Sequence, residues 1–256
     1  MGYTPNEIMI IAAARALRND DVCFVGIGMP SAAANVARLT HAPDITLVYE
    51  SGTIATKPDV LPLSIGDGEL CDTALTTVSV PEMFRYWLQG GRLTVGFIGG
   101  AQIDRFANLN TTVVGPYERP KVRLPGGGGA PEIATSCGEI YIIMKQSKRS
   151  FVAQVDFVTS LGHGDGRGAR ARLGVTTKGP TKLVTDLAVF EPDAESREMT
   201  VVSIHPGVTR AAIEANTGWP VRYAAKVAET PAPTADELGV LRELNARTAR
   251  AHGINA

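Results

Sequence analysis

The residues with the clearest chemical potential stand where a short apolar run stops. Residues 45–49 are aliphatic, β-branched or aromatic, which predicts a buried strand, and they lead directly into Glu50, Ser51 and Gly52. A parallel strand delivers a carboxylate at its end to the crevice where open α/β sheets bind ligands. Gly52 lacks a Cβ and permits a positive φ, so a substrate could approach the backbone there. The pattern predicts that Glu50 attacks a substrate or hydrogen-bonds a sugar; a solvent-facing acid at a strand end is the alternative.

A second stretch with chemical potential is the run of four glycines at 126–129, between Pro125 and Ala130. It precedes a predicted helix, and successive unhindered amides before a helix form a cradle for an anion. The run is not a phosphate-binding P-loop, because no Lys-Ser or Lys-Thr pair follows the glycines. A flexible connector or a tight turn is the alternative that the residues alone leave open.

Residues 26–31, Gly-Ile-Gly-Met-Pro-Ser, follow a predicted strand and open a predicted helix. They nearly match the dinucleotide-binding pattern G-x-G-x-x-G, and Glu50 ends the next strand about where a ribose-binding acid would stand. Two features count against an NAD site. Ser31 replaces the third glycine, and Pro30 constrains the turn that would face the pyrophosphate. The local pattern therefore leaves an NAD-binding oxidoreductase as a rival interpretation.

The elements that must position these residues follow from apolar periodicity and from capping residues. Helices are predicted at 5–18, 31–39, 80–89 and 234–252, and Thr4 is expected to cap the first of them with Pro5 as its first residue. Strands are predicted at 21–26, 45–49, 93–98, 139–144, 152–159, 183–190 and 199–204. This alternation predicts an α/β fold with an open, mostly parallel sheet and helices on both faces. We expect a single domain over residues 1–256, with a C-terminal helix after the proline-rich stretch at 231–233.

Composition argues against several classes of function. Of the 256 residues, 44% are hydrophobic and 20% are charged, and the net charge of −1 provides no basic footprint for nucleic acid or an anionic membrane. No apolar run approaches the roughly 18 residues that span a bilayer, and no signal peptide is predicted. Cys23, Cys71 and Cys137 are odd in number and far apart, which favours a reducing cytoplasm. No metal site is expected, because His163 and Asp165 are too few ligands, and their segment is interpreted as a mobile polar loop.

Motifs spread over residues 5–250 resemble those of one family. They are the Glu50-Ser51-Gly52 turn and residues 26–30, 99–104, 108–112, 125–130, 205–209 and 216–219, and residues 61–70 and 84–92 add to the likeness. On these motifs the chain resembles the β subunit of the family I coenzyme A transferases, on the glutaconate CoA-transferase branch. The resemblance implies that Glu50 is the covalent nucleophile. It also implies that Gly52, Gly127, Gly128 and Gly129 bind acyl-CoA or its oxyanion.

The same resemblance implies a reaction and a partner. We expect a ping-pong transfer of CoA from succinyl-CoA to a dicarboxylic acid, with 3-oxoadipate, an intermediate of aromatic catabolism, ahead of glutaconate as acceptor. An α subunit is expected to complete the enzyme as a hetero-oligomer, and no metal or redox cofactor is required. An acyl-CoA hydrolase or decarboxylase on the same fold is a rival; relatives of that kind depart from the Glu-Ser-Gly turn, which this chain retains.

Overall fold

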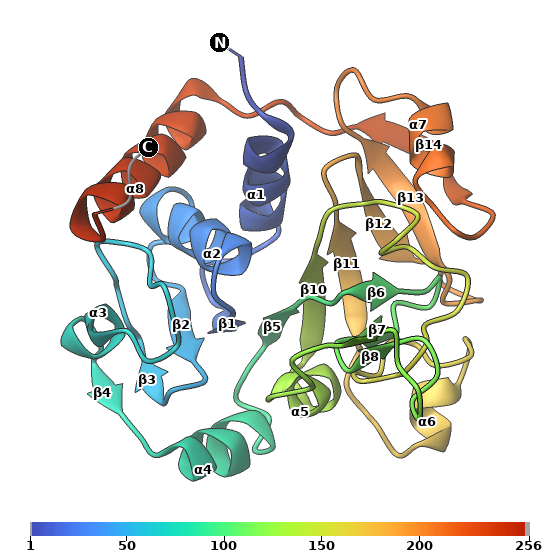
Figure 1. Ribbon diagram of the computed structural model, residues 1–256. Coiled ribbons are helices and arrows are strands. Elements are labelled where there is room, and N and C mark those ends of the chain that lie inside the picture. The colour runs from blue at the N-terminus through green and yellow to red at the C-terminus, as the bar shows by residue number, and fades with distance from the viewer. Residues whose placement is uncertain (1, 254–256) are drawn as a thin grey trace. The chain divides into compact units, whose positions relative to one another are not determined.

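The computed structural model describes residues 2–253, which belong to two compact units (Figure 1). The first unit comprises Met1–Phe97 together with Ala232–Ala256, and the second comprises Ile98–Pro231. The C-terminal helix therefore belongs to the unit that the N-terminal part of the chain forms. The single domain expected over residues 1–256 stays a prediction.

The first unit combines a mixed set of strands with helices. Its elements are α1 (Pro5–Arg15), β1 (Val22–Val25), α2 (Met29–Leu39), β2 (Thr46–Tyr49), β3 (Thr53–Ile54), α3 (Gly68–Asp72), β4 (Thr76–Thr77), α4 (Val80–Glu82), the π-helix η1 (Met83–Leu88), β5 (Val95–Ile98) and α8 (Ala235–Ala251). Strand β1 pairs in parallel with both β2 and β5, whereas β3 pairs antiparallel with both β2 and β4. The strand order is therefore β5-β1-β2-β3-β4.

Capping residues define where α1 and α8 begin. The Thr4 side chain accepts a hydrogen bond from the Glu7 amide, and the Glu7 carboxylate accepts one from the Thr4 amide at 2.7 Å. Thr234 and Glu237 form the same capping box at the start of α8. Glu237 also accepts two hydrogen bonds from Arg15, at 2.7 and 2.6 Å, which join α8 to the last turn of α1. The predicted starts of both helices are confirmed.

Helices cover both faces of the sheet in the first unit. The hydroxyl of Tyr49 on β2 contacts Ser31 on α2, whereas the ring of Phe24 on β1 meets the ring of Phe84 on η1 edge-to-face at 6.3 Å. Tyr49 pairs with Val25, the residue after Phe24, and successive side chains of a strand point to opposite faces. Helix α2 and η1 therefore lie on opposite faces of this sheet.

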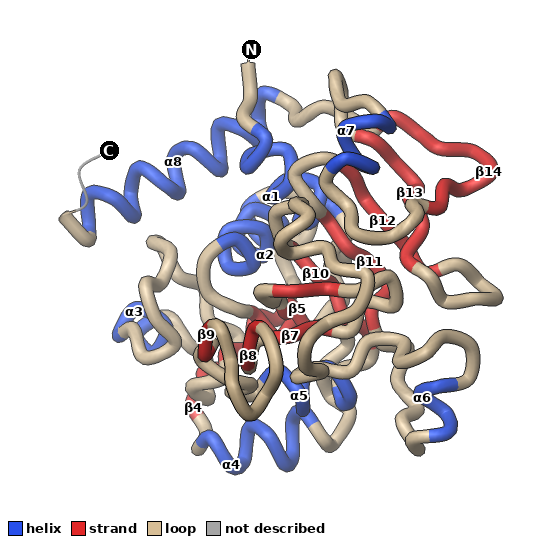
Figure 2. Tube along the Cα trace, turned by 45° about the vertical axis from the view of Figure 1, so that its right-hand side comes forward, coloured by secondary structure: helices blue, strands red, loops and turns tan. Residues whose placement is uncertain are grey.

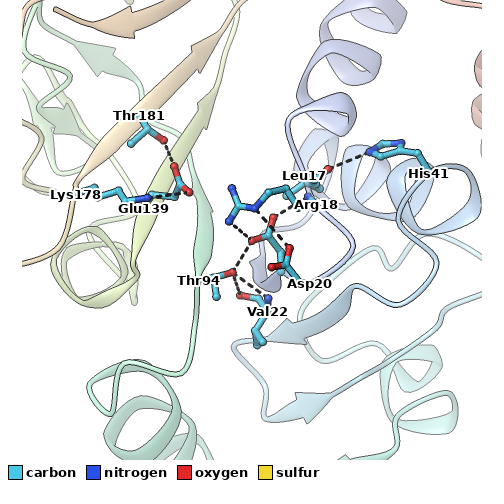
Figure 3. A network of polar contacts seen from close by, with 10 residues as sticks. Leu17, Arg18, Asp20, Val22, His41, Thr94, Glu139, Lys178 and Thr181 are labelled. Atoms are coloured by element: carbon cyan, nitrogen blue, oxygen red, sulfur yellow. Dashed lines mark hydrogen bonds and ion pairs between the residues drawn. The ribbon is translucent and has the colours of Figure 1, made fainter. Parts of the chain in front are cut away.

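A buried carboxylate fixes the start of β1. Asp21 is 1% exposed and accepts hydrogen bonds from the Arg18 amide, the Arg18 guanidinium and the Thr94 hydroxyl, at 2.7–2.8 Å. Figure 3 shows Arg18 and Thr94 in this network beside Val22, whose amide also donates to Thr94. The strand begins directly after this anchor.

The second unit contains the remaining strands and three short helices. Its elements are β6 (Gln102–Ile103), β7 (Leu109–Asn110), β8 (Val113–Val114), β9 (Val122–Arg123), α5 (Ala130–Ser136), β10 (Glu139–Ile143), α6 (Ala169–Arg172), β11 (Pro180–Val184), β12 (Ala188–Pro192), β13 (Met199–Ile204), α7 (Arg210–Ala215) and β14 (Arg222–Glu229). The five longer strands run side by side in the order β10-β11-β12-β13-β14 (Figures 1 and 2). Strands β10 and β11 are parallel, as are β13 and β14, whereas β12 is antiparallel to both of its neighbours. The two-stranded sheets β6-β7 and β8-β9 complete the unit.

Two predicted strands of the second unit are wrong. Residues 152–159 form no strand. The chain makes isolated β-bridges at Phe151 and Ser160, on either side of this segment. Between them, the Asp156 carboxylate accepts hydrogen bonds from the Gly115 amide and the Gln102 side chain. Residues 183–190 are not one strand but the hairpin of β11 and β12. The Thr185 hydroxyl accepts hydrogen bonds from the amides of residues 187 and 188 and so stabilises the reversal.

Candidate active site

Glu50 lies at the carboxyl end of the parallel strand β2, as predicted. The Gly52 amide donates to the Tyr49 carbonyl at 3.0 Å, which closes a four-residue turn with Glu50 and Ser51 at its centre. Tyr49 is fully buried, whereas Glu50 is only partly buried. Within residues 2–253 the Glu50 carboxylate has no hydrogen-bond partner. The strand therefore holds the backbone while the carboxylate stays available to a ligand.

Gly52 has a structural reason to be glycine. Its φ is +104°, and a Cβ at this position would lie 2.0 Å from the Val78 carbonyl oxygen. The Val78 amide donates to the Gly52 carbonyl at 2.9 Å, so the turn packs directly against the segment after β4. The space that a side chain would need is occupied by this chain's own backbone. A role of Gly52 in binding substrate stays a prediction.

A buried pair of hydroxyls supports the strand that carries Glu50. Ser31 Oγ and Tyr49 Oη are 2.8 Å apart, and both residues are fully buried. Burial raises the pKa of Tyr49 to about 12, so the phenol keeps its proton at neutral pH. In the dinucleotide pattern the third glycine allows close packing of helix on strand; here the Ser31 side chain makes that contact through a hydrogen bond. Residues 26–31 therefore have an architectural role beside Glu50, and the hydroxyl pair that performs it was not predicted.

Two hydroxyls next to Glu50 are buried without a partner. Ser51 Oγ and Thr53 Oγ1 are inaccessible to solvent and make no hydrogen bond to any residue that the structure describes. A buried polar group left unpaired costs about 1–3 kcal/mol, and such groups are rare in folded proteins. The turn around Glu50 thus combines an available carboxylate with unsatisfied hydroxyls.

The glycine-rich run forms a loop of the second unit that leads into α5. Gly126 is anchored through its amide to the Thr111 carbonyl at 2.8 Å, and Gly129 is the N-cap of α5. Gly128 has a φ of +48°, with open space where a side chain would begin. Among the described residues, no acceptor receives a hydrogen bond from the amides of residues 127–129. The loop therefore presents consecutive amides that lack a partner, as an anion cradle requires.

Three threonines, Thr111, Thr112 and Thr159, pack against this loop. Thr159 Oγ1 accepts a hydrogen bond from the Thr111 amide at 2.9 Å and lies 2.7 Å from the Thr112 hydroxyl. The Thr159 methyl group would lie 3.3 Å from a Cβ on Gly127. Thr112 was part of a motif in the sequence, but nothing in the sequence near Thr159 indicated its role.

Other residues of the family-like motifs are structural. Asp104 accepts hydrogen bonds from the Phe106 amide and from both the amide and the side chain of Asn108, and its burial raises the pKa of its carboxyl group. His205 contacts the Thr185 carbonyl at 2.8 Å, and Trp219 stacks on Phe151 with ring centroids 5.5 Å apart. These contacts hold the fold of the second unit together.

The interpretation of His163 as part of a mobile polar loop is wrong. His163 is 2% exposed, and its Nε2 lies 2.7 Å from the Pro180 carbonyl oxygen. Burial lowers the pKa of His163 to about 4, so the ring is neutral and donates through Nε2–H. Asp165, two residues later, is exposed and pairs with Arg172.

The structure thus places Glu50 and Gly52 together in one turn of the first unit and Gly127, Gly128 and Gly129 together in one loop of the second. Over residues 2–253, no three His, Cys, Asp or Glu side chains are grouped as metal ligands. Over the same residues, no helix is long and apolar enough to cross a membrane.

Comparison with known proteins identifies the family. The model of the coenzyme A transferase family matches residues 6–216, and the chain belongs to this family. It is 61% identical to one subunit of the 3-oxoadipate CoA-transferase of Pseudomonas knackmussii, over 98% of this chain and 96% of that protein. It is 36% identical to the corresponding subunit of the glutaconate CoA-transferase of Acidaminococcus fermentans, over 94% of this chain and 92% of that one.

Solved structures agree with this assignment. The crystal structure of the Acidaminococcus fermentans glutaconate CoA-transferase matches with a TM-score of 0.91 and 32% identity, over 100% of this chain and 98% of that chain. The decarboxylase AibA/AibB matches with a TM-score of 0.83 and 25% identity, over the full length of both chains. The predicted family and the predicted α/β fold with an open, mostly parallel sheet are confirmed.

Proposed function

We propose that this chain is the glutamate-bearing subunit of an enzyme that transfers CoA from succinyl-CoA to a dicarboxylic acid, with 3-oxoadipate as the preferred acceptor. The observation that carries the proposal is the 61% identity, over nearly the whole length of both chains, to the Pseudomonas knackmussii 3-oxoadipate CoA-transferase chain. The 36% identity to a glutaconate CoA-transferase chain supports a second dicarboxylate as the alternative acceptor.

The proposed nucleophile is Glu50. Its carboxylate would attack the carbonyl carbon of succinyl-CoA and expel CoA thiolate, leaving a mixed succinyl-glutamyl anhydride. The thiolate would then attack the glutamyl carbonyl and release succinate, which leaves CoA bound to Glu50 as a thioester. The acceptor carboxylate would reverse both steps. Covalent catalysis of this kind divides one difficult exchange into easier ones.

Two features of the first unit support this role. The available carboxylate of Glu50 follows a fully buried residue, so its backbone position is fixed. A carboxylate is a weak nucleophile toward a thioester, so precise placement must supply much of the rate. The hydrogen bond between Gly52 and Val78 stabilises the turn against displacement.

We propose that the amides of Gly127, Gly128 and Gly129 donate to the oxyanion that forms when the thioester is attacked. Their lack of acceptors among the described residues supports this role. One well-placed donor of this kind contributes about 3 kcal/mol to transition-state stabilisation. For Gly52 the role is less direct, because its own amide already donates within the turn; we propose that it shapes the turn and lets substrate reach Glu50.

We also propose that the chain works with a separate α subunit in a hetero-oligomer. The two CoA-transferase relatives are each named as one of the subunits of their enzymes. A cytoplasmic location is proposed as well; Cys23, Cys71 and Cys137 are all free thiols, as a reducing compartment requires.

One assay distinguishes CoA transfer from hydrolysis and decarboxylation of the acyl-CoA. The chain is co-expressed with its α subunit, and succinyl-CoA is incubated with 3-oxoadipate, glutaconate, acetoacetate or acetate while each CoA ester and free CoA are quantified. We expect CoA to pass to 3-oxoadipate with the highest kcat/KM. Net release of free CoA or of CO₂ would instead indicate a hydrolase or a decarboxylase, the activity named for one structural neighbour. A tenfold preference for another acceptor, about 1.4 kcal/mol, would refute the substrate but not the transferase.

A further inference from the structure

A pocket of the second unit, separate from the glycine loop, is lined by cations without carboxylates. It encloses about 330 Å³, and its charged lining residues are Arg170, Lys178 and Arg197. The neutral ring of His163 also lines it, and the charges of Arg197 and Arg170 help to lower the pKa of that histidine. Three cations around one recess create a positive potential that favours an anionic ligand.

Arg170 is a buried cation held only by neutral groups. It is 8% exposed, and its guanidinium donates to the carbonyl oxygens of residues 134, 161, 162 and 177 and to the Thr177 hydroxyl. Gly179 makes room for it, because a Cβ there would lie 2.9 Å from the guanidinium. Within residues 2–253 no carboxylate pairs with Arg170, and its burial lowers its pKa to about 10. A buried charge without a counter-ion is costly, and an anion in the pocket would offset that cost.

Arg197 contributes a second, independent observation. It lies in the turn between β12 and β13, where the Asp193 amide donates to the Glu198 carbonyl, and its φ is +66°. A residue with a Cβ is strained in this left-handed region, which glycine or asparagine occupies more easily. Arginine at such a position, with its side chain lining a cationic pocket and no ion pair in the described part of the chain, indicates that the side chain is used.

Lys178 supplies a third cation, whose side chain is largely exposed. Its Nζ lies 3.7 Å from a Glu139 oxygen, and its side chain is 69% exposed. Glu139, which is not a lining residue, also accepts a hydrogen bond from Thr181 at 2.6 Å (Figure 3). The Lys178 ammonium is therefore only loosely held and has donors left for a ligand.

We propose that this pocket binds a phosphoryl group, with Arg197 and Lys178 as its direct donors and the buried charge of Arg170 behind them. The inference is independent of the proposed transferase reaction. Two sources share this chemistry: inorganic phosphate, and the phosphates that CoA carries on its adenosine end.

The test measures the thermal unfolding of the full chain, with its partner subunit if one co-purifies, in potassium phosphate against potassium chloride at equal ionic strength. The variants are Arg197→Asn, which suits a positive φ, and Lys178→Gln. Arg149→Gln removes one exposed cation outside the pocket and is the matched control. At ten times the dissociation constant, phosphate is expected to raise the Tm of the unmodified chain and of the control by about 3 °C. Both pocket variants should lose most of this rise while keeping their Tm in chloride.

The outcomes show whether the pocket binds a phosphoryl group and which molecule supplies that group. No rise in the unmodified chain, or an equal rise in both pocket variants, overturns the site. If adenosine 3′,5′-bisphosphate stabilises the chain at lower concentrations than inorganic phosphate does, and Arg197→Asn removes that advantage, the site binds the phosphates of CoA. If the bisphosphate gains nothing over inorganic phosphate in a chain that responds to phosphate, the site binds the free ion.

Discussion

Replacing Gly52 by alanine perturbs the turn beside Glu50 in a way that the structure quantifies. The new methyl group would lie 2.0 Å from the Val78 carbonyl oxygen, well inside van der Waals contact, and both neighbours belong to backbone that pairs at 2.9 Å. The φ of +104° adds strain for any residue that has a Cβ. The turn or the segment after β4 must therefore move.

The cost can be estimated from these two effects. Backbone strain of this kind costs about 1–3 kcal/mol, and loss of the hydrogen bond from Val78 to Gly52 about 1 kcal/mol. Together they predict a destabilisation of about 2–4 kcal/mol, or about 5–15 °C in Tm for a chain of this size. Displacing Glu50 by about 1 Å should also lower kcat by roughly a hundredfold.

Gly174→Ala is the matched control. Gly174 has a φ of +72° with open space around it, so alanine there introduces the backbone strain without the collision. We expect that control to lose about 1–2 kcal/mol and to keep its transferase rate. Thermal unfolding by circular dichroism and the succinyl-CoA assay measure both properties. Equal stability losses in the two variants, or normal turnover in Gly52→Ala, would refute the role assigned to the contact with Val78.

Three further predictions concern other parts of the chain. Gly128→Val should lower turnover at least about tenfold with the fold retained, whereas Gly128→Asn, which tolerates a φ of +48°, should lower it less; equal, near-normal rates would make the loop a mere connector. Burial lowers the pKa of His163 to about 4 in the fold, against 6.5 in the unfolded chain. The free energy of unfolding should therefore be highest above pH 6.5 and fall by as much as about 3 kcal/mol as the pH drops toward 4. Urea unfolding of His163→Gln should show a smaller fall in this free energy over the same pH range. Added NAD should leave the Tm unchanged, and a clear rise would revive the dinucleotide interpretation.

Local signals in the sequence predicted correctly several of the elements that position the candidate residues. The strand that ends at Glu50 and the helices that begin after Thr4 and Thr234 depend on nearby residues, namely an apolar run or a capping box. The positive φ of Gly52 and Gly128 was also within reach, because glycine is the residue that such turns favour.

The elements that were predicted wrongly or not at all depend on tertiary contacts. Thr185 closes a hairpin inside an apolar run, and Asp156 folds a segment that periodicity favours as a strand. Strand β14 was missed because its alanines, lysine and exposed positions give no strand pattern, and it is defined by pairing with β13. Val78 supports the Glu50 turn through its backbone, and Thr159 supports the glycine loop through its hydroxyl group; such contacts leave no trace in a single sequence.

The covalent intermediate on Glu50 is the most direct test of the proposed mechanism. The assembled enzyme is incubated with succinyl-CoA alone, trapped, digested with trypsin and analysed by mass spectrometry. Glu50 falls in the peptide 39–85, because Lys57 precedes a proline. The mechanism predicts a CoA adduct on Glu50 within this peptide, absent from Glu50→Gln. An adduct on another residue, or full transferase activity in Glu50→Ala, would contradict it.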